Sequence, residues 1–285
     1  MYENIVVAFD GSAYSKSALM ETANWIKRHG GNAVLVYTVY FDEEEFGIIP
    51  EQLEKRMNIG RTLCDQAKED VSSASGINLE SIVCEGDPSD TLVKIAQAKK
   101  ADLIVIGTHG RSGIKKFLMG SVTSGVIASS TCDVLVVKKA DSDWSGRYSS
   151  ILLPFDGSGP GRKALEQACR ISIMDGSAVT VLYVVPRYEE MIEFFRSSVI
   201  QESLMKEAQK ITALAVDLAL EKGVNVKVVI EDGDVISRIS ETAVREKNDL
   251  IIMGSHGWGG VNKAYIGSTT ERLIMHAGSP ILVVK

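Results

Sequence analysis

Short apolar runs recur along the chain, and longer stretches between them carry apolar residues three or four positions apart. Apolar runs of four to eight residues are typical of strands buried on both faces, whereas the wider spacing is typical of amphipathic helices. In the first half, we expect strands at Ile5–Phe9, Ala33–Tyr40, Leu79–Glu85, Asp102–Ile106 and Val134–Val137.

The second half repeats this order of elements. Its expected strands are Ile151–Phe155, Val179–Val185, Val224–Ile230, Leu250–Met253 and Ile281–Val284. Long helices are expected over residues 51–75 and 190–221, one in each half. Apolar strands that alternate with helices predict an α/β fold in which a parallel sheet is covered by helices on both faces.

A glycine motif also occurs twice. Gly107-Thr-His-Gly110 is followed, after nine residues, by Gly120-Ser121, and Gly254-Ser-His-Gly257 is followed, after nine residues, by Gly267-Ser268. The copies lie 147 residues apart, so the repeating unit is a whole domain rather than a short solenoid repeat. We therefore expect domains at residues 1–140 and 148–285, joined by the polar, turn-rich stretch 139–149.

The position of this motif predicts a phosphate site in each half. Each copy follows an expected strand, and ligands of open parallel sheets bind beyond the carboxyl ends of strands. The glycines allow close approach of the backbone, and the helix start after the second glycine pair offers free N–H groups at its positive end. The hydroxyls of Ser121 and Thr123 add further donors. Neither copy contains GxxxxGK[ST], and no GxGxxG follows the first strand, which argues against P-loop ATPases and dinucleotide dehydrogenases.

With Asp10-Gly-Ser and Asp156-Gly-Ser after the first strand of each half, the motif resembles that of the universal stress protein family. The resemblance covers nearly the whole chain, which looks like a tandem member of the family. It implies two open, parallel, five-stranded sheets with helices on both faces, an arrangement like that of the adenine nucleotide alpha hydrolases. It also implies that each domain binds ATP or AMP.

The family's binding residues fall on equivalent positions in the two halves. The resemblance places the main chain of Val39 and Val184 against adenine, and Asp10 and Asp156 near the nucleoside, where they help to hold Mg²⁺ that arrives with ATP; no other metal site is expected. Thr269 replaces the usual Val, a mild change because the backbone N–H matters there. The implied nucleotide-binding residues are Asp10, Val39, Gly107, His109, Gly110, Gly120, Ser121, Val122, Thr123, Asp156, Val184, Gly254, His256, Gly257, Gly267, Ser268, Thr269 and Thr270.

Composition narrows the range of partners. A net charge of −6 and a pI of about 5.4 argue against nucleic-acid and anionic-membrane partners, which require a basic surface. The N-terminus begins a strand almost at once and lacks the basic and apolar regions of a signal peptide. No apolar run approaches the ~18 residues of a spanning helix. We expect a cytoplasmic protein that does not insert into membranes.

The leading interpretation is a stress-response regulatory protein, in which bound nucleotide orders the loops and changes a surface seen by a protein partner. The resemblance implies that the last strand of each half, Val134–Val137 or Ile281–Val284, pairs one domain with another. We therefore expect the two halves to pair with each other, and a homodimer is a further option. A slow ATPase or adenylate-transferring enzyme is an alternative, although a Walker lysine and a catalytic base are missing and no carboxylate is spaced to orient His109 or His256. A nucleotide-free interaction module is another.

The two glycine loops differ in charge. The first carries Arg111, Lys115 and Lys116, whereas the second carries only Lys263, beside Trp258 and two further glycines. This difference leads to the hypothesis that the first site holds triphosphates more tightly, while the second is weaker or prefers fewer phosphates.

Overall fold

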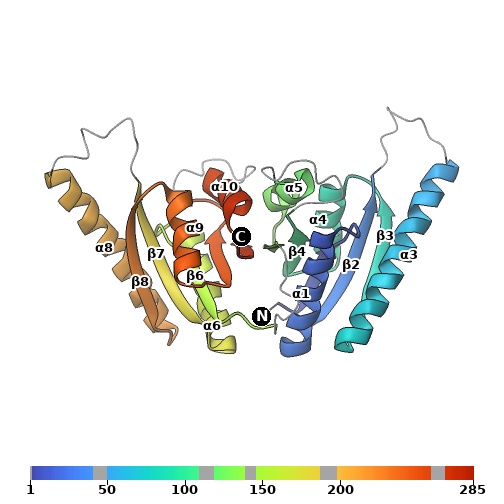
Figure 1. Cartoon of the computed structure of the whole chain (residues 1–285), viewed down its shortest axis with the longest axis horizontal. Coiled ribbons are helices and arrows are strands. Elements are labelled where there is room, and N and C mark those ends of the chain that lie inside the picture. The colour runs from blue at the N-terminus through green and yellow to red at the C-terminus, as the bar shows by residue number, and fades with distance from the viewer. Residues whose placement is uncertain (1, 41–49, 109–118, 139–145, 187–197, 258–266) are drawn as a thin grey trace. The chain divides into compact units, whose positions relative to one another are not determined.

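The computed structural model describes residues 2–40, 50–108, 119–138, 146–186, 198–257 and 267–285 (Figure 1). The chain divides into two compact units, Met1–Arg147 and Tyr148–Lys285, called the first and second unit below. No described helix combines the length and the apolarity that are needed to cross a bilayer.

The first unit alternates strands and helices as its apolar pattern predicts. Its elements are β1 (Asn4–Ala8), α1 (Ala13–His29), β2 (Asn32–Val39), α3 (Pro50–Ser75), β3 (Glu80–Glu85), α4 (Pro88–Ala98), β4 (Leu103–Gly107), α5 (Ser121–Ser129) and β5 (Asp133–Val137).

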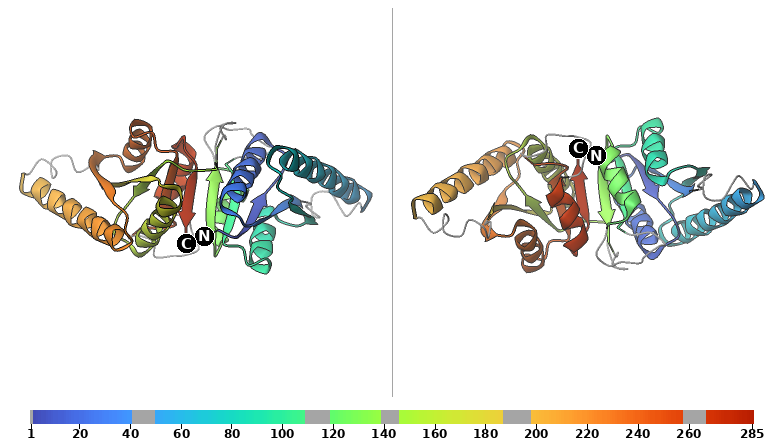
Figure 2. Two further views of the ribbon diagram at one scale, coloured as in Figure 1. Left: turned by 90° about the horizontal axis from the view of Figure 1, so that it is seen from below. Right: turned by 90° about the horizontal axis from the view of Figure 1, so that it is seen from above.

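The sheet of the first unit is parallel throughout, in the order β3-β2-β1-β4-β5. Helices α1 and α3 pack together on one face, and α4 and α5 pack together on the other (Figure 1, Figure 2). The direction of strand succession reverses between β1 and β4, so a crevice opens outside their carboxyl ends.

The second unit repeats this architecture. Its elements are β6 (Ser150–Pro154), α6 (Gly159–Asp175), β7 (Ala178–Pro186), α8 (Ser198–Glu221), β8 (Val226–Gly233), α9 (Val235–Arg245), β9 (Leu250–Gly254), α10 (Ser268–His276) and β10 (Ile281–Val284). The strand order is β8-β7-β6-β9-β10, again parallel, with the reversal between β6 and β9. Helices α6 and α8 share one face and α9 and α10 the other. The predicted α/β class with tandem parallel sheets is confirmed.

One strand is displaced from its predicted position. The sequence predicts Val224–Ile230, whereas β8 begins at Val226 and continues to Gly233. The extension follows from pairing, because the last residues of β8 align with Val184, Val185 and Pro186 of β7. A pattern of apolar positions cannot show this, because Glu231, Asp232 and Gly233 are polar or lack a side chain.

The two units carry one ion pair with reversed charges. In the first unit, Lys99 Nζ lies 3.0 Å from Glu80 Oε2 and joins the C-terminal end of α4 to the start of β3. In the second unit, Lys227 at the start of β8 pairs with Glu246 at the end of α9. Lys227 corresponds to Glu80 and Glu246 to Lys99 at the repeat offset of 147 residues, so both partners have changed sign together.

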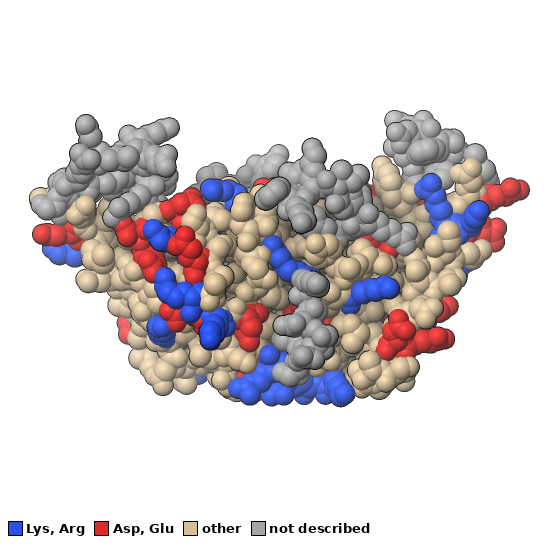
Figure 3. Space-filling view, viewed as in Figure 1, with Lys and Arg blue, Asp and Glu red and all other residues tan. Residues whose placement is uncertain are grey.

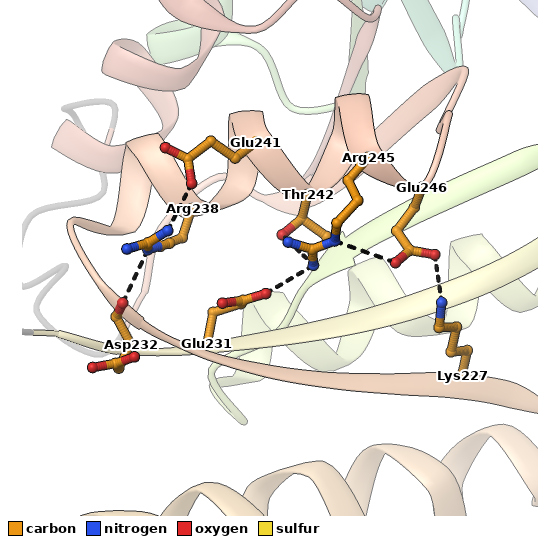
Figure 4. A network of polar contacts seen from close by, with 8 residues as sticks. All are labelled: Lys227, Glu231, Asp232, Arg238, Glu241, Thr242, Arg245 and Glu246. Atoms are coloured by element: carbon orange, nitrogen blue, oxygen red, sulfur yellow. Dashed lines mark hydrogen bonds and ion pairs between the residues drawn. The ribbon is translucent and has the colours of Figure 1, made fainter.

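The second unit extends its pair into a network (Figure 4). Arg245 lies 2.8 Å from Glu231 and 3.5 Å from Glu246, and Arg238 lies 2.7 Å from Glu241. Acidic and basic side chains accordingly interleave over α9 in Figure 3. The corresponding positions of the first unit hold Cys84, Ala98, Thr91 and Lys94, which cannot form this network.

We predict that Lys99→Glu destabilises the first unit by about 1 kcal/mol or less, because it places two carboxylates together at a solvent-exposed site. Adding Glu80→Lys recreates the arrangement of the second unit and should recover most of the loss. Urea unfolding of the wild type, both single variants and the double variant measures the coupling. The prediction would be contradicted if the double variant lost as much unfolding free energy as the two single variants lose together.

Candidate functional site

The candidate site of each unit lies at the strand-order reversal, outside the carboxyl ends of the two central strands. In the first unit Asp10 follows β1 and Gly107 ends β4, and these strands are hydrogen-bonded neighbours. In the second unit Asp156 and Gly254 hold the equivalent positions on β6 and β9. The fold thus brings together two motifs that are about a hundred residues apart in sequence.

The base of each glycine loop is closed by two hydrogen bonds. In the first unit, Gly120 N–H donates to the Thr108 carbonyl at 3.2 Å, and the Thr123 hydroxyl donates to the Gly107 carbonyl at 2.9 Å. The second unit has the same pair of bonds, Gly267 N–H to the Ser255 carbonyl at 3.2 Å and Thr270 Oγ1 to the Gly254 carbonyl at 3.4 Å. The protein's own hydrogen bonds therefore hold the strand end and the helix start together without a ligand.

The two threonines use their hydroxyls differently from the sequence expectation. Thr123 and Thr270 are each only 2% exposed, and their hydroxyls donate inward to the loop base. We had expected the Thr123 hydroxyl to face phosphate. In contrast, Ser121 and Ser268, the first residues of α5 and α10, are exposed.

The starts of α5 and α10 have no side-chain cap. Their N-cap residues are Gly120 and Gly267, which have no side chain that could accept a hydrogen bond from the first turn. The first-turn N–H groups of a helix have no intrahelical partner, and they carry the positive end of its dipole. Val122 is partly exposed and Thr269 exposed in this turn. An anion with several oxygen acceptors suits such a site.

The first glycine of each motif is required by packing. A Cβ on Gly107 would lie 2.8 Å from the backbone carbon of Tyr14, in the first turn of α1. A Cβ on Gly254 would lie 2.7 Å from the backbone carbon of Pro160, in the first turn of α6. These glycines let a helix start press against the end of a central strand, a reason for glycine that does not depend on a ligand.

The second motif glycine of the second unit lies against Asp156. A Cβ on Gly257 would come within 2.7 Å of Asp156 Oδ2, while Oδ1 accepts the Ser158 N–H at 3.0 Å. Asp10 makes the equivalent bond, its Oδ1 accepting the Ser12 N–H at 2.9 Å. The carboxylate of Asp156 therefore links the turn after β6 to the glycine loop.

The remaining predicted residues are distributed as follows. His256 is partly exposed, and its Nδ1 lies 3.0 Å from Ser255 Oγ. His109 and Gly110 lie outside the described residues, as do the charged loop positions Arg111, Lys115, Lys116 and Lys263 and the neighbouring Trp258.

Val39 and Val184 lie within the sheet. The Val39 carbonyl accepts the Gly86 N–H at 3.1 Å, and Val184 pairs with Glu231 two residues before the end of β7. Their main chain thus already takes part in strand pairing, and contact with adenine stays a prediction.

Metal-binding side chains do not gather in the part of the chain that is described. No group of three or more His, Cys, Asp and Glu residues is found there. Asp10 and Asp156, which follow the first strand of each unit, belong to no such group among the described residues.

Each unit has a further acidic residue at the N-terminal end of a helix, directly after its third strand. Asp87 caps α4 by accepting the Asp90 N–H at 3.0 Å, and Asp234 caps α9 by accepting the Ser237 N–H at 2.9 Å. Hydrogen bonds from Ser89 and Asp90 lower the pKa of Asp87, and those from Ser237, with Arg272 nearby, lower the pKa of Asp234. Each of these aspartates therefore caps the helix that follows the third strand of its unit.

Comparison with known proteins identifies relatives of both units. The family model described as the universal stress protein family matches residues 1–138 and 147–285. A universal stress protein of Methanocaldococcus jannaschii is 33% identical over 145 residues, which cover 49% of this chain and 84% of the relative. The universal stress protein YxiE of Bacillus subtilis is 32% identical over 152 residues, covering 48% of this chain and all of the relative.

A solved structure shares the complete two-unit fold. The crystal structure of a universal stress protein from Archaeoglobus fulgidus aligns with a TM-score of 0.76 and covers 99% of this chain and 98% of that one. The two sequences are 22% identical, so this likeness concerns the fold.

We predict that Gly107→Ala and Gly254→Ala each destabilise their unit by about 1–3 kcal/mol, because the added methyl group meets the backbone of a packed helix. Chemical unfolding measures the loss. Gly278→Ala is the matched control, because nothing lies within 4 Å of its Cβ position. Equal stability of Gly254→Ala and Gly278→Ala would contradict the packing role.

The Asp87 cap predicts a pH dependence. Its pKa is lowered in the folded protein, so its stabilisation is present above the unfolded-state pKa of about 3.9 and is lost as the pH falls through the folded-state value. Asn caps helices as well as Asp but does not titrate. The stability difference between wild type and Asp87→Asn should therefore be constant near neutral pH and shift against the wild type below about pH 4. A difference that stays constant in urea titrations down to acid pH would refute this.

Proposed function

The chain belongs to the universal stress protein family, and from that premise we propose that it is a regulatory protein that binds an adenine nucleotide, ATP or AMP, in each unit. One observation carries the proposal. At both strand-order reversals, a closed glycine loop stands beside an uncapped helix start and an Asp turn, with the same spacing in the two units.

The groups of each crevice suit the parts of a nucleotide. The free N–H groups and the exposed hydroxyl at the start of α5 or α10 match phosphate oxygens. Asp10 and Asp156 supply an acceptor for ribose hydroxyls or for a divalent ion that accompanies ATP. Val39 at the end of β2 and Val184 near the end of β7 would lie against the base.

Regulation follows from the position of the loop. Each loop is held at its base, and residues 109–118 and 258–266 connect the strand end to the helix start in the two units. A nucleotide that binds the loop backbone and the helix start stabilises one arrangement of that surface over others. A protein partner that prefers this arrangement would then be recruited or released according to nucleotide occupancy.

Co-purification tests the proposal directly. The protein is purified rapidly, desalted and denatured, and the released small molecules are identified by mass spectrometry. We expect ATP or AMP in an amount approaching one equivalent per unit. The proposal would be refuted if the purified protein held no nucleotide and calorimetry detected no heat of binding with ATP or AMP.

Charge at the helix starts tests where the nucleotide binds. Ser121→Glu and Ser268→Glu each place a carboxylate beside the proposed phosphate position, so each should remove about one equivalent and weaken binding at least tenfold, the effect of losing a charge-assisted contact. Gln66→Glu and Gln209→Glu add the same charge on exposed faces of α3 and α8 and should change nothing. Loss of nucleotide in these controls would indicate a general charge effect.

A further inference from the structure

Arg272 introduces a positive charge at the helix starts of the second unit. It is the fifth residue of α10, and its Nη2 lies 3.6 Å from Oδ2 of Asp234, the N-cap residue of α9. Helices α9 and α10 pack side by side on the same face of the sheet. The guanidinium therefore bridges two neighbouring helix starts at the carboxyl edge of the sheet.

Arg272 is the fifth of the nine residues of α10 and follows Glu271, the acidic residue of the first turn. Helical side chains lean toward the N-terminus, which brings Arg272 over the turn that begins at Ser268. Its guanidinium thus lies over the same turn as the first N–H groups of α10 and the carboxylate of Glu271.

Asp234 balances this charge only weakly. Its carboxylate already accepts the Ser237 N–H at 2.9 Å and the Ser237 hydroxyl at 2.8 Å. The side chains of Arg272 and Asp234 are 55% and 50% exposed, and ion pairs at such exposure contribute little stability. A multiply charged anion at the α10 start can therefore compete with Asp234 for the guanidinium.

The first unit has no counterpart of this pair. Gly125 occupies the equivalent position, and a Cβ there would lie 2.7 Å from the Ser89 side chain, so α4 and α5 pack too closely for a larger residue. Asp87 instead accepts a hydrogen bond from the Ser89 hydroxyl at 2.6 Å. Within the described residues, the second unit therefore has Glu271 and Arg272 where the first unit has Ser124 and Gly125, and only Arg272 adds a positive charge there.

We propose that Arg272 is a specificity residue of the second nucleotide site. Its guanidinium moves from Asp234 to the phosphate chain of the bound nucleotide, so the site favours ATP over AMP. The inference rests on the proposed function. It reverses the expectation from the loop sequences, which counted a single lysine for the second loop and predicted a preference for fewer phosphates. Counting loop charges alone misses a cation that lies one turn inside the following helix.

The test uses the full-length chain with Ser121→Glu in every protein, so that the first site is blocked. Calorimetric titration with ATP and with AMP is compared for this background and for Arg272→Gln, Arg272→Lys and Asp234→Asn added to it. We expect Arg272→Gln to weaken ATP about tenfold and AMP much less, the effect of losing one charge-assisted contact. Arg272→Lys should restore most of the ATP affinity.

Asp234→Asn separates a binding role from a structural one. Asn preserves the helix cap, but it no longer competes for the guanidinium, so ATP should bind as tightly as before or more tightly. A merely structural ion pair would make Asp234→Asn and Arg272→Gln weaken ATP alike, and that result would overturn the inference. An unchanged ATP-to-AMP ratio in Arg272→Gln would do the same. No binding of either nucleotide to the background and to the wild type would overturn the proposed function, and this inference with it.

Discussion

The close contact between the first helix and the end of a central strand determines how each unit is built. The first turn of α1 or α6 rests on the last residue of β4 or β9, a distance that only glycine permits. This contact brings the Asp turn after β1 or β6 to the base of the glycine loop. The buried threonine of the next helix then closes that base from the other side. A strand end, two helix starts and a loop thus meet at one point, and the exposed groups around it form the crevice.

The two units keep this frame and differ around it. The hydrogen bonds of the loop base, the Asp turns and the capping aspartates recur at the same spacing, and their geometry is nearly the same in both. The face formed by α9 and β8 instead carries an ion network where α4 and β3 have small or uncharged residues. Duplication has therefore preserved the groups that shape the crevice while the charges beside it have diverged. If the proposed function holds, two crevices with a common frame and unequal electrostatics would respond to different nucleotides.

Much of this could be predicted from the sequence, because strands buried on both faces leave short apolar runs and the repeat aligns the halves. The parallel sheets, the positions of most strands and the site at the carboxyl edge follow from these patterns. The role of Thr123 could not be predicted, because a hydroxyl near a phosphate motif gives no sign of facing the Gly107 carbonyl. The extension of β8 depends on pairing with β7, which polar residues do not reveal. The position of Arg272 near Asp234 depends on how two helices pack, which periodicity alone does not determine.

The reversed ion pair at the amino edge of the sheets limits how the halves can exchange parts. Two similar repeats in one gene are prone to recombine, and a crossover that falls between β3 and α4 would join Glu80 to the glutamate at position 246. The reciprocal hybrid would place two lysines together. Only Gly86 and Asp87 separate that strand from its helix, so the strand and helix must move as one block for the charges to match. A block that contains β3 with α4, or β8 with α9, therefore keeps its charges matched on exchange, whereas a crossover between them costs about 1 kcal/mol or less.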